Sequence, residues 1–68
     1  MDTAELFQAL GFIFAEMGEG RLVTFSLDSE EGSWTARAVY YGEVVRVEES
    51  GYDEAIIKLW NHMEKVRG

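Results

Sequence analysis

The chain has 68 residues, a formal net charge of −7 and no cysteine. This length allows one domain, over residues 1–68, and the absence of cysteine excludes disulfide bridges and zinc sites built on cysteine. Phosphate groups must be met by lysine and arginine, so six such residues against thirteen acids argue against broad binding to nucleic acid or anionic membranes.

The sequence also lacks the signals of export and membrane insertion. No apolar run approaches the roughly 20 residues that a membrane span requires. The acidic start MDTAELFQAL has no basic region of the kind that opens a signal peptide. We therefore expect a cytoplasmic protein whose charge favours a basic partner.

Residues 3–17 are expected to form the first helix. Its apolar residues recur at spacings of three and four and so share one face: Leu6, Leu10, Ile13, Phe14 and Met17. Asp2 and Glu5 resemble a capping box, with Thr3 as an alternative cap. Gly18 stands where a helix-terminating glycine belongs.

Three strands are expected next, at residues 21–27, 33–41 and 44–49, with a turn at 28–32 and a type II′ turn at Gly42-Glu43. Alternation of apolar and polar residues gives each strand one buried side. The side expected to face inward carries Val23, Phe25, Leu27, Trp34, Ala36, Ala38, Tyr40, Val45 and Val47. The opposite side, the open sheet face, carries Thr24, Ser26, Thr35, Arg37, Val39, Tyr41, Val44 and Arg46.

A second helix is expected from about residue 52 to 66. Ser50 is its expected N-cap, with Asp53 three residues later. Its buried stripe is expected at Ala55, Ile56, Leu59, Met63 and Val66. The element order predicts an α+β fold, α-β-β-β-α, in which a three-stranded antiparallel sheet has both helices on one face.

This topology brings most of the acids to one end of the molecule, which we call the acidic pole. It comprises Asp2, Glu5, Asp28, Glu30, Glu31, Glu48, Glu49, Asp53 and Glu54, and no lysine or arginine is expected there. Acids at helix starts oppose the helix dipole, and Asp28 is a usual turn former. Glu30, Glu31, Glu48 and Glu49 have no such local reason. Solubility alone and binding of a basic partner both remain open as explanations.

Two families resemble this chain. The element order is similar to that of the double-stranded-RNA-binding domain. The stretch EEGSWTARAVYYGEVVRVEESGYDEAI resembles the core of HicB-like antitoxins. Residues 23–60 cover the whole match. That family has an acidic hairpin, a second hairpin and then a helix; here YYGEVV replaces its Pro- and Cys-containing segment, and the first helix is additional. Small proteins of this order also resemble phage anti-CRISPR inhibitors.

The resemblance to the RNA-binding domain implies contacts through the first helix, the first hairpin loop and lysines at the start of the second helix. The corresponding positions here are Asp28, Glu30 and Glu31, followed by Asp53 and Glu54. Anions at these positions would repel phosphate. The resemblance therefore carries over the topology and not the activity.

Two function hypotheses are compatible with these patterns, beside a purely structural domain. The first is a non-enzymatic acidic module that neutralises a basic nucleic-acid-handling protein, antitoxin-like or inhibitor-like, with the acids as a phosphate mimic. The second is a nucleic-acid-binding regulator that uses Arg37 and Arg46 on the open sheet face. A patch for a partner or a second copy is also expected on that face, from Arg37, Val39, Tyr41, Val44 and Arg46.

No enzyme, metal or cofactor is expected. Asp28, Glu30 and Glu31 do not follow the spacing of a calcium loop, and acids on a convex tip lack the cleft that carboxylate catalysis needs. His62 has no nucleophile or second metal ligand at helical spacing, because Val66 stands four residues on.

Overall fold

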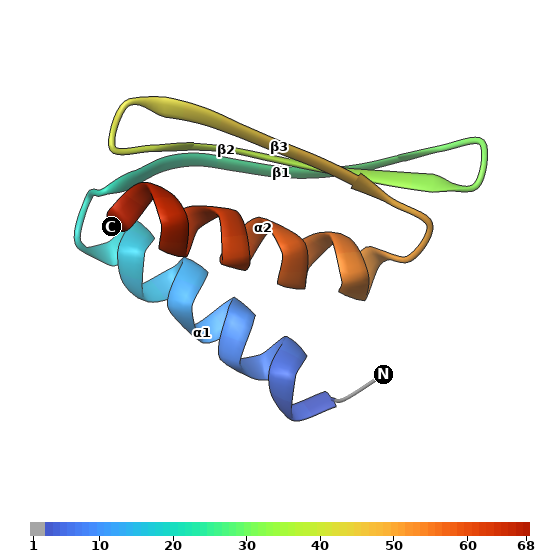
Figure 1. Cartoon of the computed structure of the whole chain (residues 1–68), viewed down its shortest axis with the longest axis horizontal. Coiled ribbons are helices and arrows are strands. Elements are labelled where there is room, and N and C mark those ends of the chain that lie inside the picture. Colours follow the sequence, from blue (N-terminus) through green and yellow to red (C-terminus); the bar gives the residue numbers. More distant parts are fainter. Residues whose placement is uncertain (1–2) are drawn as a thin grey trace.

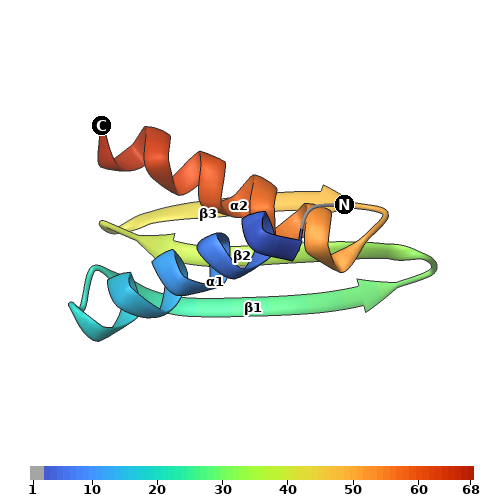
Figure 2. The ribbon, with the colours of Figure 1, turned by 90° about the horizontal axis from the view of Figure 1, so that it is seen from below.

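A computed structural model describes residues 3–68 and confirms the α-β-β-β-α order (Figure 1). The elements are α1 (Thr3–Gly18), β1 (Leu22–Glu30), β2 (Ser33–Tyr40), β3 (Glu43–Glu49) and α2 (Tyr52–Arg67). The strands form one antiparallel sheet in the order β1-β2-β3, so β2 is the central strand. Both helices cover the same face of the sheet (Figure 2). The Asp2 part of the expected capping box lies outside the described residues.

The first hairpin is longer and tighter than expected. Glu30 pairs with Ser33, so only two residues make the turn, and both have positive φ: 49° at Glu31 and 81° at Gly32. This is the type I′ pattern, which suits the twist of adjacent strands. The expected turn at 28–32 is therefore wrong, because residues 28–30 continue the strand.

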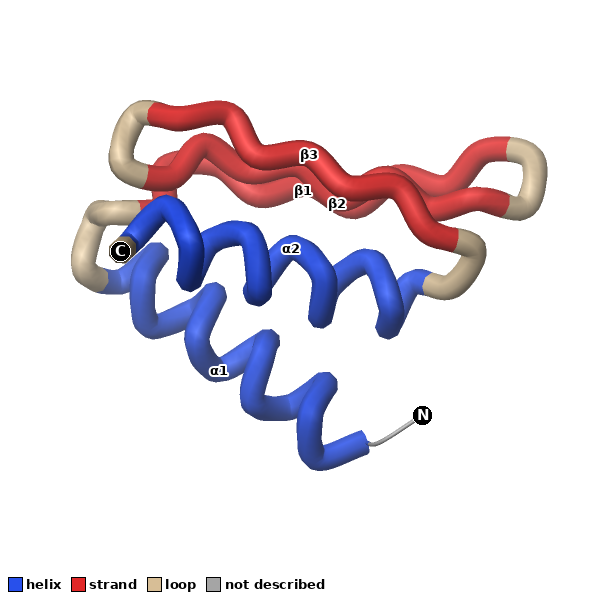
Figure 3. Tube along the Cα trace, in the orientation of Figure 1, coloured by secondary structure: helices blue, strands red, loops and turns tan. Residues whose placement is uncertain are grey.

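The second hairpin has the same design at the opposite end of the sheet (Figure 3). Tyr40 pairs with Glu43, and the turn residues Tyr41 and Gly42 have φ values of 52° and 77°. The expected type II′ turn at Gly42-Glu43 is wrong, since the turn begins one residue earlier. Tyr41 consequently belongs to a turn and not to the open sheet face of β2.

A β-bulge near the start of β1 reverses the expected alternation. Leu22 pairs with Tyr40 and Thr24 with Val39, which leaves Val23 as the extra residue. Val23 was expected inside and is 68% exposed, whereas Leu22, which strict alternation would place on the opposite side from Val23, is 1% exposed. Beyond the bulge the expected alternation holds.

The core lies between the inner sheet face and the helices. It comprises Ala9, Ile13, Leu22, Ala36, Ala38, Tyr40, Val45, Val47, Ala55, Ile56, Ile57, Leu59 and Met63. The stripe expected on α2 is confirmed at Ala55, Ile56, Leu59 and Met63, while Val66 is only partly buried. None of the helices within residues 3–68 is long and apolar enough to cross a membrane.

Helix α1 is rotated relative to the expected stripe. Its buried residues are Ala9, Ile13 and Glu16, whereas Phe14 is 61% exposed and Met17 is 39% exposed. The rotation follows from Glu16, whose carboxylate is held on the inner side by Tyr40 and Arg21. Phe14 lies two residues before Glu16, and Met17 lies one residue after it. Both are therefore turned toward solvent.

The end of α1 is set by Gly20 and not by Gly18. The amide of Gly20 donates to the carbonyl of Met17, and the amide of Arg21 donates to the carbonyl of Glu16, both at 3.1 Å. This pair of bonds is a Schellman motif, which requires the left-handed conformation that Gly20 adopts at φ 79°. Gly18 is the last residue of α1, and the expectation that it is the helix-terminating C′ glycine is wrong, because Gly20 has that position.

The start of α2 also differs from its expected form. Gly51 is the N-cap and makes no side-chain capping bond, so the expected Ser50 cap is wrong. The Asp53 carboxylate accepts a hydrogen bond of 2.8 Å from the amide of Glu54 instead. Asp53 and Glu54 lie in the first turn, where they oppose the helix dipole.

Candidate functional site: the acidic hairpin tip

The sheet register divides the expected acidic pole into two groups. Asp28 pairs with Thr35, and Thr35 pairs with Glu48, which places the two acids on the open sheet face. Glu49 is the next residue along β3 and points to the helix face, because side chains alternate along a strand. The acids of the open-face group are Asp28, Glu30, Glu31 and Glu48, which we call the hairpin-tip acids. The helix-face group is Glu49, Asp53 and Glu54.

Glu30 and Glu31 stand on a projecting ribbon of β1 and β2, while Asp28 on β1 and Glu48 on β3 lie beside its base. Trp34 is the partner of Glu49, the last residue of β3, so the ladder beyond Trp34 has only two strands. Figure 1 shows this hairpin reaching past the N-terminal end of α2. Ser33 Oγ lies 3.1 Å from Glu48 Oε2 and 3.2 Å from the carbonyl oxygen of Glu30, within hydrogen-bonding distance of both. Ser33 thus links the tip to β3.

A shallow pocket of about 270 Å³ lies against this tip. Its lining residues are Glu30, Glu31, Ser33, Thr35, Arg46 and Glu48. Three carboxylates and two hydroxyls therefore face one concave surface, with Arg46 as its only basic residue. Such a surface suits the ammonium or guanidinium group of a partner, since charge-assisted bonds to carboxylates are the strong ones.

Glu31 occupies an unfavourable backbone conformation. Its φ of 49° lies in the left-handed region, where the first central position of a type I′ turn favours asparagine, aspartate or glycine. Tyr41 has the same position in the second turn, but its ring contacts the ring of Tyr40, with centroids 4.7 Å apart. Within residues 3–68 Glu31 makes no hydrogen bond or ion pair that compensates for its conformation.

The helix-face group is less available than expected. Lys58 Nζ lies 2.7 Å from Glu49 Oε2, and this hydrogen bond raises the pKa of Lys58. The expectation that no lysine or arginine lies at the acidic pole is therefore wrong: Lys58 pairs with Glu49, and Arg46 lines the hairpin-tip pocket. Asp53 is engaged at the helix start, which leaves Glu54 as the exposed acid of this group.

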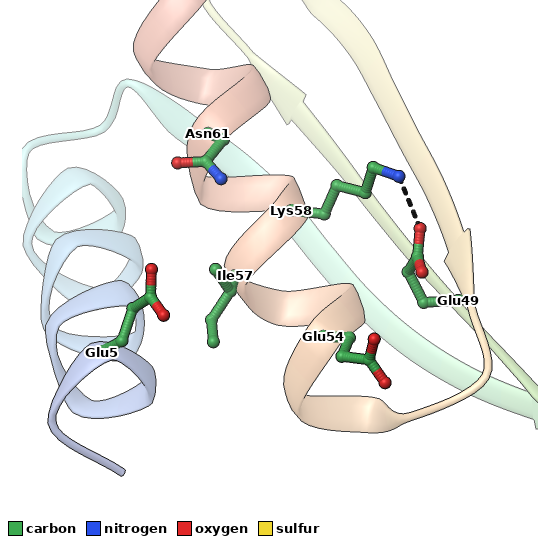
Figure 4. Close-up of a pocket in the computed structure, with 6 residues that line it drawn as sticks. All are labelled: Glu5, Glu49, Glu54, Ile57, Lys58 and Asn61. Atoms are coloured by element: carbon green, nitrogen blue, oxygen red, sulfur yellow. Dashed lines mark hydrogen bonds and ion pairs between the residues drawn. The ribbon is translucent and has the colours of Figure 1, made fainter. Parts of the chain in front are cut away.

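A second pocket, of about 310 Å³, lies beside this group between α1 and α2. Its lining residues are Glu5, Glu49, Glu54, Ile57, Lys58 and Asn61. Figure 4 shows Glu5 on α1 facing Ile57 on α2, with Lys58 turned away toward Glu49. Within residues 3–68 no cluster of three or more histidine, aspartate or glutamate residues is placed to hold a metal ion.

The open sheet face carries its residues in rows across the strands. Val39 and Val44 are direct partners, and Arg37 and Arg46 are direct partners in the next row. Neither arginine forms an ion pair within residues 3–68. Two like charges directly opposite each other destabilise a sheet. The expected patch of Arg37, Val39, Val44 and Arg46 is thus a contiguous surface, which Tyr41 does not join because it lies in the turn.

A buried polar network was not expected from the sequence. Arg21 holds Glu16 through two bonds, Nε to Oε1 at 2.8 Å and Nη2 to Oε2 at 2.6 Å, and Tyr40 Oη donates to the same Oε1. The bonds from Arg21 hold the pKa of Glu16 at about 2. Burial, together with the bond to Glu16, raises the pKa of Tyr40 to about 12. The sequence signal for this network was the acid Glu16 within the otherwise apolar run IFAEMG. The network joins α1 to β2.

Protein-family models, curated proteins and solved structures were compared with the chain, and none of them matches it.

Proposed function

We propose that the hairpin-tip acids dock this protein on a basic, nucleic-acid-handling protein and occupy the surface that nucleic acid would otherwise contact. The protein acts without catalysis, as antitoxins and small phage inhibitors do. It meets this partner in the cytoplasm. The acids bind lysine and arginine side chains, as phosphate groups do, but from a folded hairpin.

The observation that carries this proposal is the position of Glu31. A residue at φ 49° in a type I′ turn costs the fold free energy that asparagine or glycine would save. Tyr41 offsets the same cost through its contact with Tyr40, and Glu31 has no comparable contact within residues 3–68. A carboxylate kept at the outermost point of the hairpin against this cost supports a role outside the fold.

The charge distribution supports the same partner. The chain carries a net charge of −7, and four exposed acids lie at or beside the first hairpin turn, where Arg46 is the basic residue of their pocket. A field of one sign speeds the encounter with a surface of the opposite sign, and salt screens it over about 10 Å at 0.1 M. Binding should therefore be fast and should weaken steeply as the salt concentration rises.

The test is capture of the partner from a bacterial lysate on the immobilised chain, with two matched charge reversals. Glu30→Lys changes the residue before the first turn, and Glu43→Lys makes the same change beside the second turn, at the other end of the sheet. The wild type and Glu43→Lys should capture the same basic protein at about 50 mM salt and release it near 200 mM. Glu30→Lys should capture at least about tenfold less.

Equal loss of capture in both variants would mean that total charge, and not the hairpin tip, determines binding. Capture that persists in Glu30→Lys and at high salt would also contradict the proposal. Circular dichroism of both variants shows whether the fold is retained, which is expected because both glutamates are exposed.

The unpaired arginines favour a second candidate function, that of a nucleic-acid-binding regulator. Arg37 and Arg46 stand opposite each other without an ion pair in the described chain, and a phosphate group between them would relieve their repulsion. Labelled DNA and RNA should then bind at about 50 mM salt and fail to bind Arg46→Glu. That variant should remain folded, because it creates an opposite-charge pair across the strands. Absence of binding by the wild type at low salt removes this candidate.

A further inference from the structure

Helix α1 presents to solvent a face that carries no charge. Its members are Phe7, Gln8, Gly11, Phe14, Ala15 and Gly18, which we call the α1 outer face; all six are exposed. Phe7 is 68% exposed and Phe14 is 61% exposed, and Met17 borders them at 39%. The acids of α1, Glu5 and Glu16, lie on its other side, near the core and α2.

The exposed residues of helix α2 have the composition of an ordinary surface helix. They are Tyr52, Glu54, Lys58, Asn61, His62, Glu64, Lys65 and Arg67, and most of them are charged. In α1 Glu5 is the only exposed residue that is charged. A helix that is apolar on both faces is normally covered on both. The α1 outer face therefore has the composition of a buried surface.

Two glycines on this face have no role within the chain. A Cβ atom added to Gly11 or Gly18 would have no heavy atom within 4 Å, so neither glycine makes room for a neighbouring segment. Neither has positive φ, and the Schellman turn uses Gly20. Glycine inside a helix is unfavourable relative to alanine. The remaining explanation for Gly11 and Gly18 is that they let a molecule from outside the chain approach the helix closely.

The spacing of large and small residues on the α1 outer face is self-complementary. Phe7 and Phe14 are seven residues apart, and so are Gly11 and Gly18. If a second α1 lies antiparallel, placing Phe14 over the partner's Gly11 also places Phe7 over the partner's Gly18. A two-fold axis makes both contacts occur twice. Each ring then fills the open space above a glycine.

We propose that the α1 outer face binds a second copy of this chain, in an antiparallel helix pair with Phe7 and Phe14 packed on Gly18 and Gly11 of the partner. The absence of charge makes this the face through which two molecules of net charge −7 can approach each other. The β1–β2 hairpin extends away from α1 (Figure 1), so the hairpin tip remains free for another partner.

The dimer should be weak and reversible. Phe7, Phe14 and Met17, with the small residues between them, offer roughly 400 Å² per copy, since a fully buried aromatic residue covers about 150–250 Å². A standard interface uses about 800 Å² per partner, so we expect a dissociation constant of about 1–100 μM. A domain of this size buries only about 60% of the surface that its unfolded chain exposes, so it gains from a second copy.

Lipid is a poorer occupant for this face. Helices that lie on membranes carry lysine or arginine beside the apolar face. α1 has neither residue, and the acids elsewhere in the chain would be repelled by anionic lipids.

Sedimentation equilibrium of the full chain at concentrations up to about 1 mM tests the proposal. The wild type should pass from monomer to dimer, and Phe14→Glu should raise the dissociation constant at least about 30-fold. Val44→Glu is the matched control, because Val44 is equally exposed, at 69%, but lies on the open sheet face. It should dimerise like the wild type.

Gly11→Leu tests whether the dimer requires close packing above the glycine or only an apolar surface. The added side chain meets no atom of its own chain and favours the helix, so the monomer should fold normally. It occupies the space meant for the partner's Phe14, so the dimer should be lost.

Three results would overturn the proposal. A wild type that remains monomeric at about 1 mM has no such interface. Loss of the dimer in Val44→Glu but not in Phe14→Glu would assign it to the open sheet face. A monomer that instead binds phosphatidylcholine vesicles through Phe14 would assign the α1 outer face to lipid.

Discussion

Glu16 is the one charged residue that the described chain buries, at 4% exposure. A buried carboxylate is costly unless its oxygens are bonded, and here both are: Oε1 by Arg21 and Tyr40, and Oε2 by Arg21. The Schellman turn through Gly20 carries Arg21 back onto the last turn of α1, where its side chain meets Glu16. Backbone and side-chain hydrogen bonds thus both stabilise the connection between α1 and β1.

This network predicts a specific loss of stability in acid. The pKa of Glu16 is about 2 in the folded protein, below its ordinary value of 4.5, so the unfolded chain takes up the proton first as the pH falls. Its contribution is complete above about pH 4.5 and is lost between there and pH 2. Urea unfolding of the wild type between pH 7 and pH 2 should show this decline.

Glu16→Gln removes the titration and should lower the free energy of unfolding at pH 7 by about 1.5–3 kcal/mol, the contribution of hydrogen bonds to a charged group. Its stability should then fall less steeply with acid than that of the wild type. Glu43→Gln, at an exposed position, is the control that should keep the wild-type slope. Identical slopes in Glu16→Gln and the wild type would show that other groups cause the acid sensitivity.

The two hairpin turns have the same backbone geometry. They differ in whether a side-chain contact offsets the free-energy cost of the left-handed residue. Tyr41 has a ring contact to Tyr40, and Glu31 has no compensating contact in the described chain. We expect Glu31→Asn to raise the free energy of unfolding by about 0.5–1 kcal/mol, because asparagine tolerates the left-handed conformation. The same variant should weaken capture of the basic partner. Thermal and urea unfolding measure the first effect, and an unchanged or lowered stability would remove the argument from strain.

Residue patterns predicted the elements of this fold but not the points where single residues break the pattern. Periodicity located both helices and all three strands, and the stripe of α2 from Ala55 to Met63 was correct. The bulge at Val23 and the choice of Gly20 over Gly18 were not predictable, because each depends on a pairing or a backbone angle that several residues could satisfy. Both hairpin turns were misplaced for the same reason.

The rotation of α1 was missed because it is decided by a side-chain network. Counting apolar residues placed Phe14 and Met17 inside, since an acid is normally assigned to the surface. Glu16 is instead paired and buried, and the helix turns accordingly. For the candidate site, the sequence treated these acids as one group, but strand alternation places Glu49 on the other sheet face from the hairpin-tip acids, where Lys58 pairs with it.

At the scale of the whole molecule, two surfaces with opposite character lie on different elements. The hairpin-tip acids lie on β1, on its turn to β2 and on the end of β3, whereas the α1 outer face lies on the first helix. Binding a basic partner and binding a second copy therefore need not compete. Phe14→Glu should leave capture through the hairpin tip intact, and Glu30→Lys should leave dimerisation intact.

The most direct measurement of the central claim is competition between this protein and nucleic acid for the captured partner. Labelled DNA or RNA is bound to the partner at about 100 mM salt, and the wild type, Glu30→Lys or Glu43→Lys is titrated in. The wild type and Glu43→Lys should displace the nucleic acid fully at saturation, and Glu30→Lys should need at least about tenfold more protein. A ternary complex in which the partner keeps its affinity for nucleic acid would contradict the account.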